Sequence, residues 1–258
     1  MTSTPHPITL ITGGSRGLGA QMALALAHDG HDLVLTYREA AAAADGVVAQ
    51  IRAQGRRALA LPLDVADAAS FPAFADKVRE SLSSWGASHL AGLINNAGTG
   101  VHVSFEETTP EQLGMLFDIH LKGPFFLTQA LLPLLVGGEA GGARILNISS
   151  GLARFTIPGY GAYAAMKGAI EVLTRYQAKE LAARGIRVNT LAPGAIATDF
   201  DGGAVRDSAE LNRFIASVTA LGRVGAAEDI GGAAATLMRP GAGWITGQRV
   251  EASGGMFL

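Results

Sequence analysis

The sequence predicts an α/β fold in which a doubly wound parallel sheet of about seven strands carries helices on both faces. Short β-like runs alternate with longer helical patterns from one end of the chain to the other, and this alternation is typical of β-α-β units. Continuous apolar runs, such as LVL at residues 33–35, suit strands buried on both faces of a sheet. No linker or composition shift divides the 258 residues, so we expect one domain over residues 1–258.

The individual elements follow from apolar runs that are bounded by turn signals. Strands are expected at residues 8–12, 32–37, 57–63, 90–95, 143–148, 186–192 and 248–251. Helices are expected at residues 17–29, 40–54, 68–84, 110–135, 160–184 and 226–239. The helix at 110–135 has the clearest start, because Thr109 is a good N-cap and Pro110 suits the first helical position.

One segment departs from this regular alternation. Residues 195–209 carry Gly202, Gly203 and several charges between an expected strand and the next helix. Such a segment is typical of a mobile lid, so we predict a substrate loop over residues 195–215.

Composition excludes several classes of function. The net charge is −2, so no basic field favours nucleic acid or an anionic membrane as a partner. The chain has no cysteine, which excludes disulfides, thiol catalysis and thiolate metal sites, and we expect no metal. The opening residues show no basic and apolar regions of a secretory signal, so we expect a cytoplasmic protein.

A glycine-rich turn, TGGSRGLG at residues 12–19, joins the first strand to the first helix. Gly13, Gly17 and Gly19 allow a tight turn and the close approach of a phosphate to the helix N-terminus. Their spacing is G-x-x-x-G-x-G and differs from the general G-x-G-x-x-G fingerprint, but the position between a strand and a helix is what a dinucleotide site requires.

The end of the second strand bears on the choice of cofactor. An acid there selects NAD, whereas an arginine accommodates the 2′-phosphate of NADP. The strand ends in Thr36, Tyr37 and Arg38, and Arg16 in the glycine loop is a second guanidinium for a phosphate. We therefore predict NADP, while Glu39 leaves NAD open.

A phenol and an amine lie one helical turn apart further along the chain. Tyr163 and Lys167 are four residues apart, which places both on one helix face. A nearby ammonium is expected to lower the pKa of the phenol, and a phenol tuned in this way suits proton transfer to or from a carbonyl/alcohol pair. Ser150 adds a hydroxyl thirteen residues before Tyr163.

Taken together, these residues resemble the short-chain dehydrogenase/reductase family over nearly the whole chain. The C-terminal run from GRVGAAEDIGG to ITGQRVEASGG is similar to 3-oxoacyl-carrier-protein reductases. The motifs that carry the resemblance, in the family's order, are Thr12-Gly13-x-x-x-Gly17-x-Gly19, Asp64-Val65, Asn95-Asn96-Ala97-Gly98, Ser150, Tyr163-x-x-x-Lys167, and Pro193-Gly194 followed by Thr198.

The resemblance implies a Rossmann-type fold and a role for each matched residue. Asp64 is expected to accept from the adenine amino group, and Asn95 to fix the central strand. Ala97 and Gly98 are expected to pass close to the cofactor ribose, and Thr198 to bind the carboxamide. The full cofactor set comprises Thr12, Gly13, Ser15, Arg16, Gly17, Leu18, Gly19, Tyr37, Arg38, Asp64, Val65, Asn96, Ala97, Gly98, Tyr163, Lys167, Pro193, Gly194, Ile196 and Thr198.

The resemblance also assigns the chemistry. Tyr163 is expected to be the general acid in reduction, Lys167 to hold the nicotinamide ribose, and Ser150 to bond the substrate oxygen. The family usually has Asn where this chain has His120, and we expect His120 to keep a proton relay and to add sensitivity to pH. By their place in the chain, the expected substrate contacts are Leu152, Arg154 as an anion anchor, Tyr160 and Phe200.

Three readings of the function remain open. The leading reading is a reversible NADP(H)-dependent carbonyl reductase or alcohol dehydrogenase that acts on a small-molecule substrate. A 3-oxoacyl-carrier-protein reductase is weakened because residues 133–143 contain no Lys or Arg, which leaves Arg184 alone to dock an acidic carrier. A catalytically weak cofactor-binding sensor or scaffold is the third. From the resemblance we also expect a homotetramer.

Overall fold

The computed structural model describes residues 6–135 and 142–258. Within them, a seven-stranded sheet has the order β3-β2-β1-β4-β5-β6-β7, and every strand pair is parallel. The predicted fold class is confirmed. The strands are β1 (Ile8–Ile11), β2 (Asp32–Tyr37), β3 (Ala58–Pro62), β4 (Gly92–Asn95), β5 (Arg144–Ile148), β6 (Arg187–Pro193) and β7 (Arg249–Ala252).

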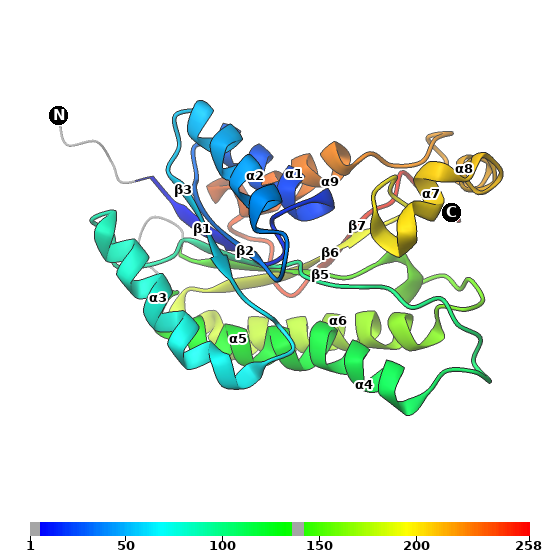
Figure 1. Cartoon of the computed structure of the whole chain (residues 1–258), viewed down its shortest axis with the longest axis horizontal. Helices are drawn as coiled ribbons and strands as arrows, with labels where there is room; N and C mark the ends of the chain where they lie inside the picture. The colour runs from blue at the N-terminus through cyan, green and yellow to red at the C-terminus, as the bar shows by residue number, and fades with distance from the viewer. Residues whose placement is uncertain (1–5, 136–141) are drawn as a thin grey trace.

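Helices cover both faces of this sheet (Figure 1). One layer contains α1 (Gly17–His28), α2 (Ala41–Ala53) and α9 (Ala227–Met238). The other contains α3 (Phe71–Ser84), α4 (Pro110–Phe117), α5 (Gly123–Leu131) and α6 (Gly161–Leu181). Successive strand residues face opposite layers, so Leu10 joins the hydrophobic cluster below the sheet and Ile11 joins the cluster above it. No helix in the described part of the chain is both long and apolar enough to cross a membrane.

The helix predicted at residues 110–135 is interrupted. Residues Asp118–Lys122 form a π-helical turn between α4 and α5, and a 3-10 turn (Leu132–Leu134) follows α5. The Gly123 N–H bonds the carbonyl of Asp118, five residues back, and Pro124 has no N–H to offer the carbonyl of His120. The interruption therefore sets the position of His120, and π turns of this kind are frequent at functional sites.

The substrate loop predicted over residues 195–215 is largely helical. A 3-10 turn (Phe200–Gly203) leads into α7 (Ala204–Asp207) and α8 (Ala209–Ser217), beside the end of β7 (Figure 1). The charges that suggested a loop pair with one another, since Arg206 contacts both Asp199 and Asp207. The Ser208 side chain caps α8 by accepting from the Leu211 N–H.

Candidate active site

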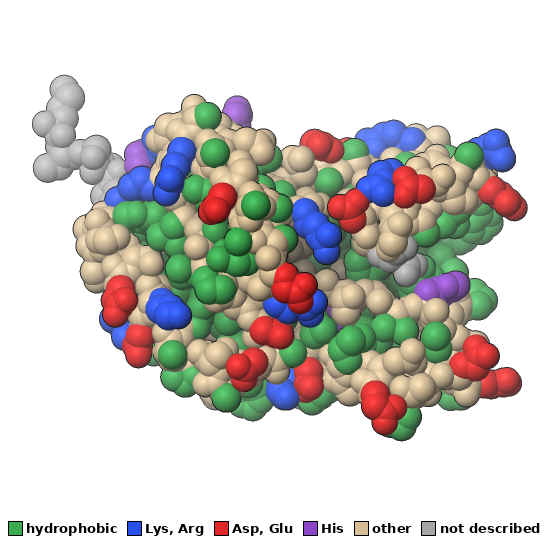
Figure 2. Space-filling view, viewed as in Figure 1, with side chains coloured by type: hydrophobic (Ala, Val, Ile, Leu, Met, Phe, Trp, Pro, Cys, Tyr) green, Lys and Arg blue, Asp and Glu red, His purple; other side chains and the backbone are tan. Residues whose placement is uncertain are grey.

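The site residues expected from the sequence converge at the carboxyl edge of the sheet. Ligands of open α/β sheets bind at this edge, outside the strand ends. The turn after β1, the ends of β4 and β5 and the segment after β6 all reach it, and Figure 2 shows a hollow there between the two helix layers.

The glycine turn has the shape that a pyrophosphate requires. Gly13 and Gly17 have positive φ angles of 66° and 54°. A Cβ on Gly19 would lie 2.1 Å from the carbonyl oxygen of Gly13, so only glycine fits there. Arg16, the N-cap of α1, makes no side-chain capping bond, and no acid lies in the first turn. The first N–H groups of α1 are therefore left for an anion.

Thr12 and Asn96 hold this turn against the end of β4. The Thr12 hydroxyl accepts from the backbone N–H groups of Asn96 and Ala97 at 2.9 and 3.0 Å. Asn96 Nδ2 donates in return to the carbonyl of Thr12 at 2.8 Å. Because Thr12 is only 2% exposed, it shapes the turn from beneath instead of facing a ligand.

Exposed cations lie where the 2′-phosphate of NADP is expected. Arg38, after β2, is paired with Glu39 at 3.0 Å, and both side chains are largely in solvent. Arg38 and Asp64 line a hollow of about 260 Å³, which also receives Lys77 from α3. Arg16 is exposed at the α1 N-terminus, Tyr37 is half-buried, and Val65 packs under the start of α5, where its carbonyl lies against Gly123.

The structure brings Ser150, Tyr163 and Lys167 together. Ser150 follows β5, and its Oγ accepts from the N–H of Leu152 at 3.2 Å. Tyr163 and Lys167 are 6% and 5% exposed on the face of α6 that meets the strand end, and the Tyr163 phenol hydrogen-bonds Ser150. Lys167 Nζ lies 5.4 Å from the centre of the Tyr163 ring and donates to the carbonyl of Ile148 at 2.8 Å.

The expected lowering of the Tyr163 pKa is not found. Burial raises the pKa of the phenol well above its usual value, and the hydrogen bond from Ser150 offsets this only in part. Burial also lowers the pKa of the Lys167 ammonium to about 7, so the cation that was expected to favour phenolate is itself costly to charge. The arrangement therefore keeps a protonated phenol, which suits a proton donor.

His120 lies beside this trio. Its ring meets the Tyr163 ring edge-on, with centroids 5.2 Å apart, and Nε2 lies 2.7 Å from the carbonyl of Thr99. A carbonyl only accepts, so this contact favours a proton on Nε2 over the longer 3.4 Å contact in which the Thr99 N–H points at the same nitrogen. With that tautomer, the buried Nδ1 has a lone pair and no partner among the described residues. Burial and then the charge of Lys167 lower the His120 pKa to about 3. The expectation that His120 titrates near neutral pH was wrong, because the ring is desolvated.

Aromatic rings form the wall beside the phenol. Phe200 packs on Tyr163 with ring centroids 5.6 Å apart, and Tyr160 packs on His102 at 4.7 Å. Leu152 is half-buried next to Ser150. The expected anion anchor is engaged elsewhere, since Arg154 makes two 2.7 Å bonds to Glu251.

The segment after β6 closes the other side of the site. Gly194 donates to the carbonyl of Ala252 at 3.1 Å, and a Cβ on it would lie 2.8 Å from the Cα of Ser253. Pro193 is buried, while Ile196 packs on the upper core. A Cβ built on Gly17 would lie 3.9 Å from that of Thr198, so the glycine turn and this segment face each other.

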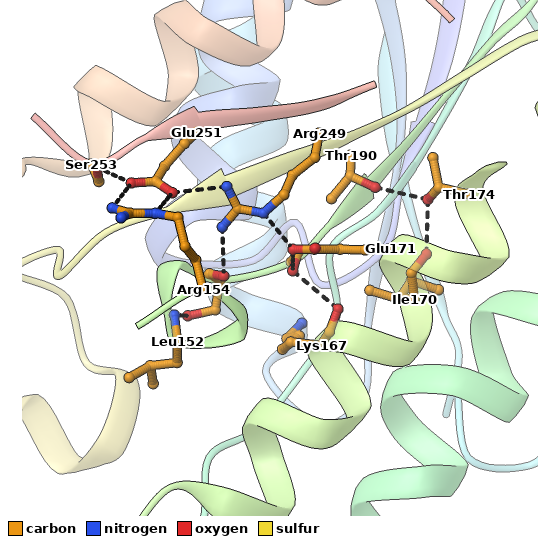
Figure 3. Close-up of polar contacts among 12 residues, drawn as sticks. Leu152, Arg154, Lys167, Ile170, Glu171, Thr174, Thr190, Arg249, Glu251 and Ser253 are labelled. Atoms are coloured by element: carbon orange, nitrogen blue, oxygen red, sulfur yellow. Dashed lines mark hydrogen bonds and ion pairs between the residues drawn. The ribbon is translucent and has the colours of Figure 1, made fainter. Parts of the chain in front are cut away.

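The sequence did not predict four polar residues behind the site: Ser149, Glu171, Arg249 and Glu251. The last three are labelled in Figure 3. Glu171 had a signal, because it follows Lys167 by one helical turn. Arg249 had none, since it reaches Glu171 from a strand 78 residues further along the chain.

Comparison with known proteins places the whole chain in one family. A family model described as enoyl-(acyl carrier protein) reductase matches residues 13–257. An uncharacterized oxidoreductase of Methylorubrum extorquens is 36% identical, over 99% of this chain and 100% of the relative. A 3-oxoacyl-[acyl-carrier-protein] reductase of Synechocystis is 35% identical over 100% of both chains. A hydroxynaphthalene reductase-like protein of Metarhizium brunneum is 34% identical over 96% of this chain and 94% of the relative.

Solved structures agree with this placement. LugOII, a promiscuous reductase that catalyses keto-reduction at C1 in lugdunomycin biosynthesis, has a TM-score of 0.89, 37% identity and 96% coverage of both chains. The angucycline C-6 ketoreductase LanV with bound NADP has a TM-score of 0.90 and 32% identity, over 97% of this chain and 95% of LanV. A short-chain dehydrogenase of Burkholderia cenocepacia in complex with NADP has a TM-score of 0.87 and 34% identity, over 96% of this chain and 97% of its own. This chain belongs to the short-chain dehydrogenase/reductase family of oxidoreductases.

Proposed function

We propose that this protein is an NADP(H)-dependent carbonyl reductase in which Tyr163 is the general acid, with alcohol oxidation as the reverse reaction. The observation that carries the proposal is the meeting of the Ser150 hydroxyl and the buried Tyr163 phenol above Lys167. When bound, NADPH supplies the hydride to the carbonyl carbon of the substrate. Everything else in the reaction is orientation, a proton and a donor for the developing alkoxide.

Each side chain of the trio has one task in this proposal. The Ser150 hydroxyl donates a hydrogen bond to the substrate oxygen, and Tyr163 Oη gives its proton to that oxygen as negative charge develops there. Lys167 binds the nicotinamide ribose. His120 holds a water through Nδ1, the lone pair left without a partner among the described residues, and so links the site to solvent.

NADP is favoured over NAD because Arg16 and Arg38 are exposed at the adenosine end of the site. Glu39, the acid that would favour NAD, is already paired with Arg38. Two similar solved structures contain NADP. The α1 N-terminus, with its positive-φ glycines and its lack of a side-chain cap, suits the pyrophosphate.

For the substrate we propose a ketone on a fused aromatic or similarly flat ring system. Phe200 packs on the Tyr163 ring, and Tyr160, three residues before Tyr163, packs on His102. Flat ligands stack well on aromatic rings of this kind. The similar proteins include, by name, an angucycline C-6 ketoreductase, a hydroxynaphthalene reductase-like protein and a keto-reductase of lugdunomycin biosynthesis. Small free ketones and sugar- or steroid-like carbonyls are the further candidates.

Carrier-bound acyl chains are the second candidate, favoured by the similarity to a 3-oxoacyl-[acyl-carrier-protein] reductase. The run of residues 133–143 that weakens it lies partly outside the described residues, which omit 136–141. Arg184, the remaining basic side chain, donates to the carbonyl of Leu132 at 2.7 Å.

NADPH oxidation by the purified protein tests the proposal. The panel contains 2-tetralone, a quinone-type polycyclic ketone, a simple aliphatic ketone and acetoacetyl thioesters. Turnover that falls about 10²-fold or more in Tyr163→Phe, with NADPH still bound, is expected. Preference for acetoacetyl thioesters would favour the carrier-protein function. Tight NADPH binding without any turnover, unchanged in Tyr163→Phe, would favour a sensor or scaffold and contradict the reductase.

We further propose a cytoplasmic homotetramer that uses the lower helix layer for assembly. Large apolar side chains are exposed on α4, α5 and α6, including Phe117 at 42%, Phe126 at 43% and Tyr176 at 64%. Exposed apolar patches of this kind mark contact surfaces. Size-exclusion chromatography with light scattering gives the mass, and a monomer would contradict the proposal.

A further inference from the structure

A chain of ion pairs runs from α6 to the C-terminal strand behind the proposed catalytic trio (Figure 3). Glu171 Oε1 accepts from Arg249 Nε at 2.8 Å, and Arg249 Nη1 donates to Glu251 Oε2 at 2.8 Å. Glu251 also accepts two 2.7 Å bonds from Arg154 and one from Ser253 at 2.6 Å. The chain thus joins α6, β7 and the turn after Ser150.

At its Glu171 end, this chain of ion pairs contacts the two segments that carry Ser150 and Lys167. Ser149 Oγ lies 2.6 Å from Glu171 Oε1, to which it donates, and 3.2 Å from the backbone carbonyl of Lys167. Arg249 Nη2 reaches the backbone carbonyl of Ser150 at 3.4 Å. The strand end that carries the Ser150 hydroxyl is therefore tied to the helical turn that carries Lys167.

At its Glu251 end, the chain of ion pairs holds the turn that follows Ser150. Arg154, four residues after Ser150, donates through Nη2 to the carbonyl of Met256 at 2.7 Å as well as to Glu251. Burial alone would raise the pKa of Glu251, but hydrogen bonds from Arg154, Ser253 and Arg249 lower it to about 2. The carboxylate is thus ionised at any working pH, and the turn after Ser150 is held at both of its ends.

These linked ion pairs differ from an ordinary surface ion pair because their side chains are largely buried. The side chains of Glu171, Arg249 and Glu251 are 13%, 23% and 18% exposed. Partly desolvated charges with several bonds each keep a defined geometry, whereas exposed pairs contribute little and move freely. A reaction that depends on alignment to within a fraction of an ångström is sensitive to such support.

We propose that Glu171 and Arg249 are positioning residues of the reduction, acting through Ser149 and the backbone of Ser150 and Lys167. They touch neither substrate nor cofactor. The inference rests on the proposed reductase function, and it adds to that function two residues on α6 and β7 that set the distance between the Ser150 hydroxyl and the α6 face.

Steady-state kinetics of Arg249→Met and Arg249→Lys test this role. Arg249→Met is expected to lower kcat about tenfold or more while KM for NADPH changes less than about twofold, since misalignment affects the transition state more than cofactor binding. Arg249→Lys, which restores the charge and one bond, is expected to recover part of kcat.

A remote ion pair provides the control. Arg239 makes a two-bond pair with Asp29 at 2.7 and 2.9 Å, joining α9 to the end of α1 at the other edge of the sheet. Arg239→Met is expected to shift Tm without changing kcat of the folded enzyme. A kcat loss in Arg249→Met that matches the loss of folded protein, or an equal loss in Arg239→Met, would overturn the positioning role.

A readout that needs no turnover separates the two proposals. Hydrogen exchange of peptides covering residues 149–155 is expected to speed up in Arg249→Met and to stay unchanged in Arg239→Met. If the wild type is inactive on every substrate, the proposed function fails, and exchange still decides whether this chain of ion pairs holds the turn. Unchanged exchange at residues 149–155 in Arg249→Met would overturn it in either case.

Discussion

Lys167 Nζ donates a 2.8 Å hydrogen bond to the backbone carbonyl of Ile148, at the end of the strand that precedes Ser150. This bond ties the amine of α6 to β5 inside the protein, where Lys167 is 5% exposed. A buried ammonium has lost most of its hydration, and a single carbonyl replaces only a part of it. The site therefore holds a lysine that costs free energy whenever it is charged.

This cost predicts how Lys167→Met changes stability with pH. Burial lowers the pKa of Lys167 from 10.5 to about 7, so the unfolded chain binds more protons than the folded chain between these values. The contribution of Lys167 to the free energy of unfolding therefore rises with pH across that window and is lowest below pH 7. Replacement by Met removes the penalty, so the gain in stability should be larger at pH 6 than at pH 9, by about 2 to 3 kcal/mol.

Thermal unfolding of wild type and variant at the two pH values measures this difference. For a chain of this size, Lys167→Met should raise Tm at pH 6 by about 5 °C or more beyond its effect on Tm at pH 9. Lys179→Met removes an exposed lysine of the same helix and should show no such dependence on pH. An equal Tm change for Lys167→Met at both pH values would mean that the amine is not desolvated.

Local signals in the sequence were sufficient for the fold but not for the details of the site. The strand predicted at residues 32–37 is β2 (Asp32–Tyr37), because apolar runs and turn residues act within a few positions. The π turn at His120 was missed, since it depends on Pro124 and on the packing of Gly123 against the Val65 carbonyl. The partner of Arg154 was missed because Glu251 lies 97 residues away.

The burial of His120 predicts its behaviour in pH–rate profiles. With a pKa of about 3, caused mainly by desolvation, the imidazole stays neutral from pH 5 to 9. His120→Asn should therefore leave the shape of the profile in this range unchanged. His120→Leu, which removes the lone pair proposed to hold a water, should lower kcat about tenfold. A new or lost limb near neutral pH in His120→Asn would show that the ring titrates there, and full activity of His120→Leu would remove it from the relay.

Arg38 is expected to discriminate between the two nicotinamide cofactors. A charge-assisted hydrogen bond contributes about 1.5 to 3 kcal/mol, so Arg38→Ala should raise KM for NADPH about tenfold or more. KM for NADH should change less than twofold, because that cofactor lacks the 2′-phosphate. Arg79→Ala, in an exposed pair with Asp76 on α3, is the control and should change neither value. Equal effects of Arg38→Ala on both cofactors would contradict a phosphate contact.

Two glycine-to-alanine substitutions, at Gly19 and Gly46, should change the stability of the protein in opposite directions. A Cβ on Gly19 would meet the carbonyl oxygen of Gly13 at 2.1 Å and Asn96 Nδ2 at 2.6 Å, so the glycine turn must open to admit it. Gly19→Ala is therefore expected to lower Tm and to weaken NADPH binding at least tenfold, since the same turn offers its N–H groups to the phosphates. Calorimetric titration with NADPH and thermal unfolding measure the two effects.

Gly46, inside α2, is the matched position, because a Cβ there has no neighbour within 4 Å among the described residues. Gly46→Ala should stabilise the protein by up to about 1 kcal/mol through helix propensity alone and leave NADPH affinity unchanged. The contrast isolates the role of the turn, because both changes add one methyl group to a helix of the same layer. If Gly19→Ala bound NADPH as tightly as Gly46→Ala does, the phosphates would have to lie elsewhere than at the α1 N-terminus.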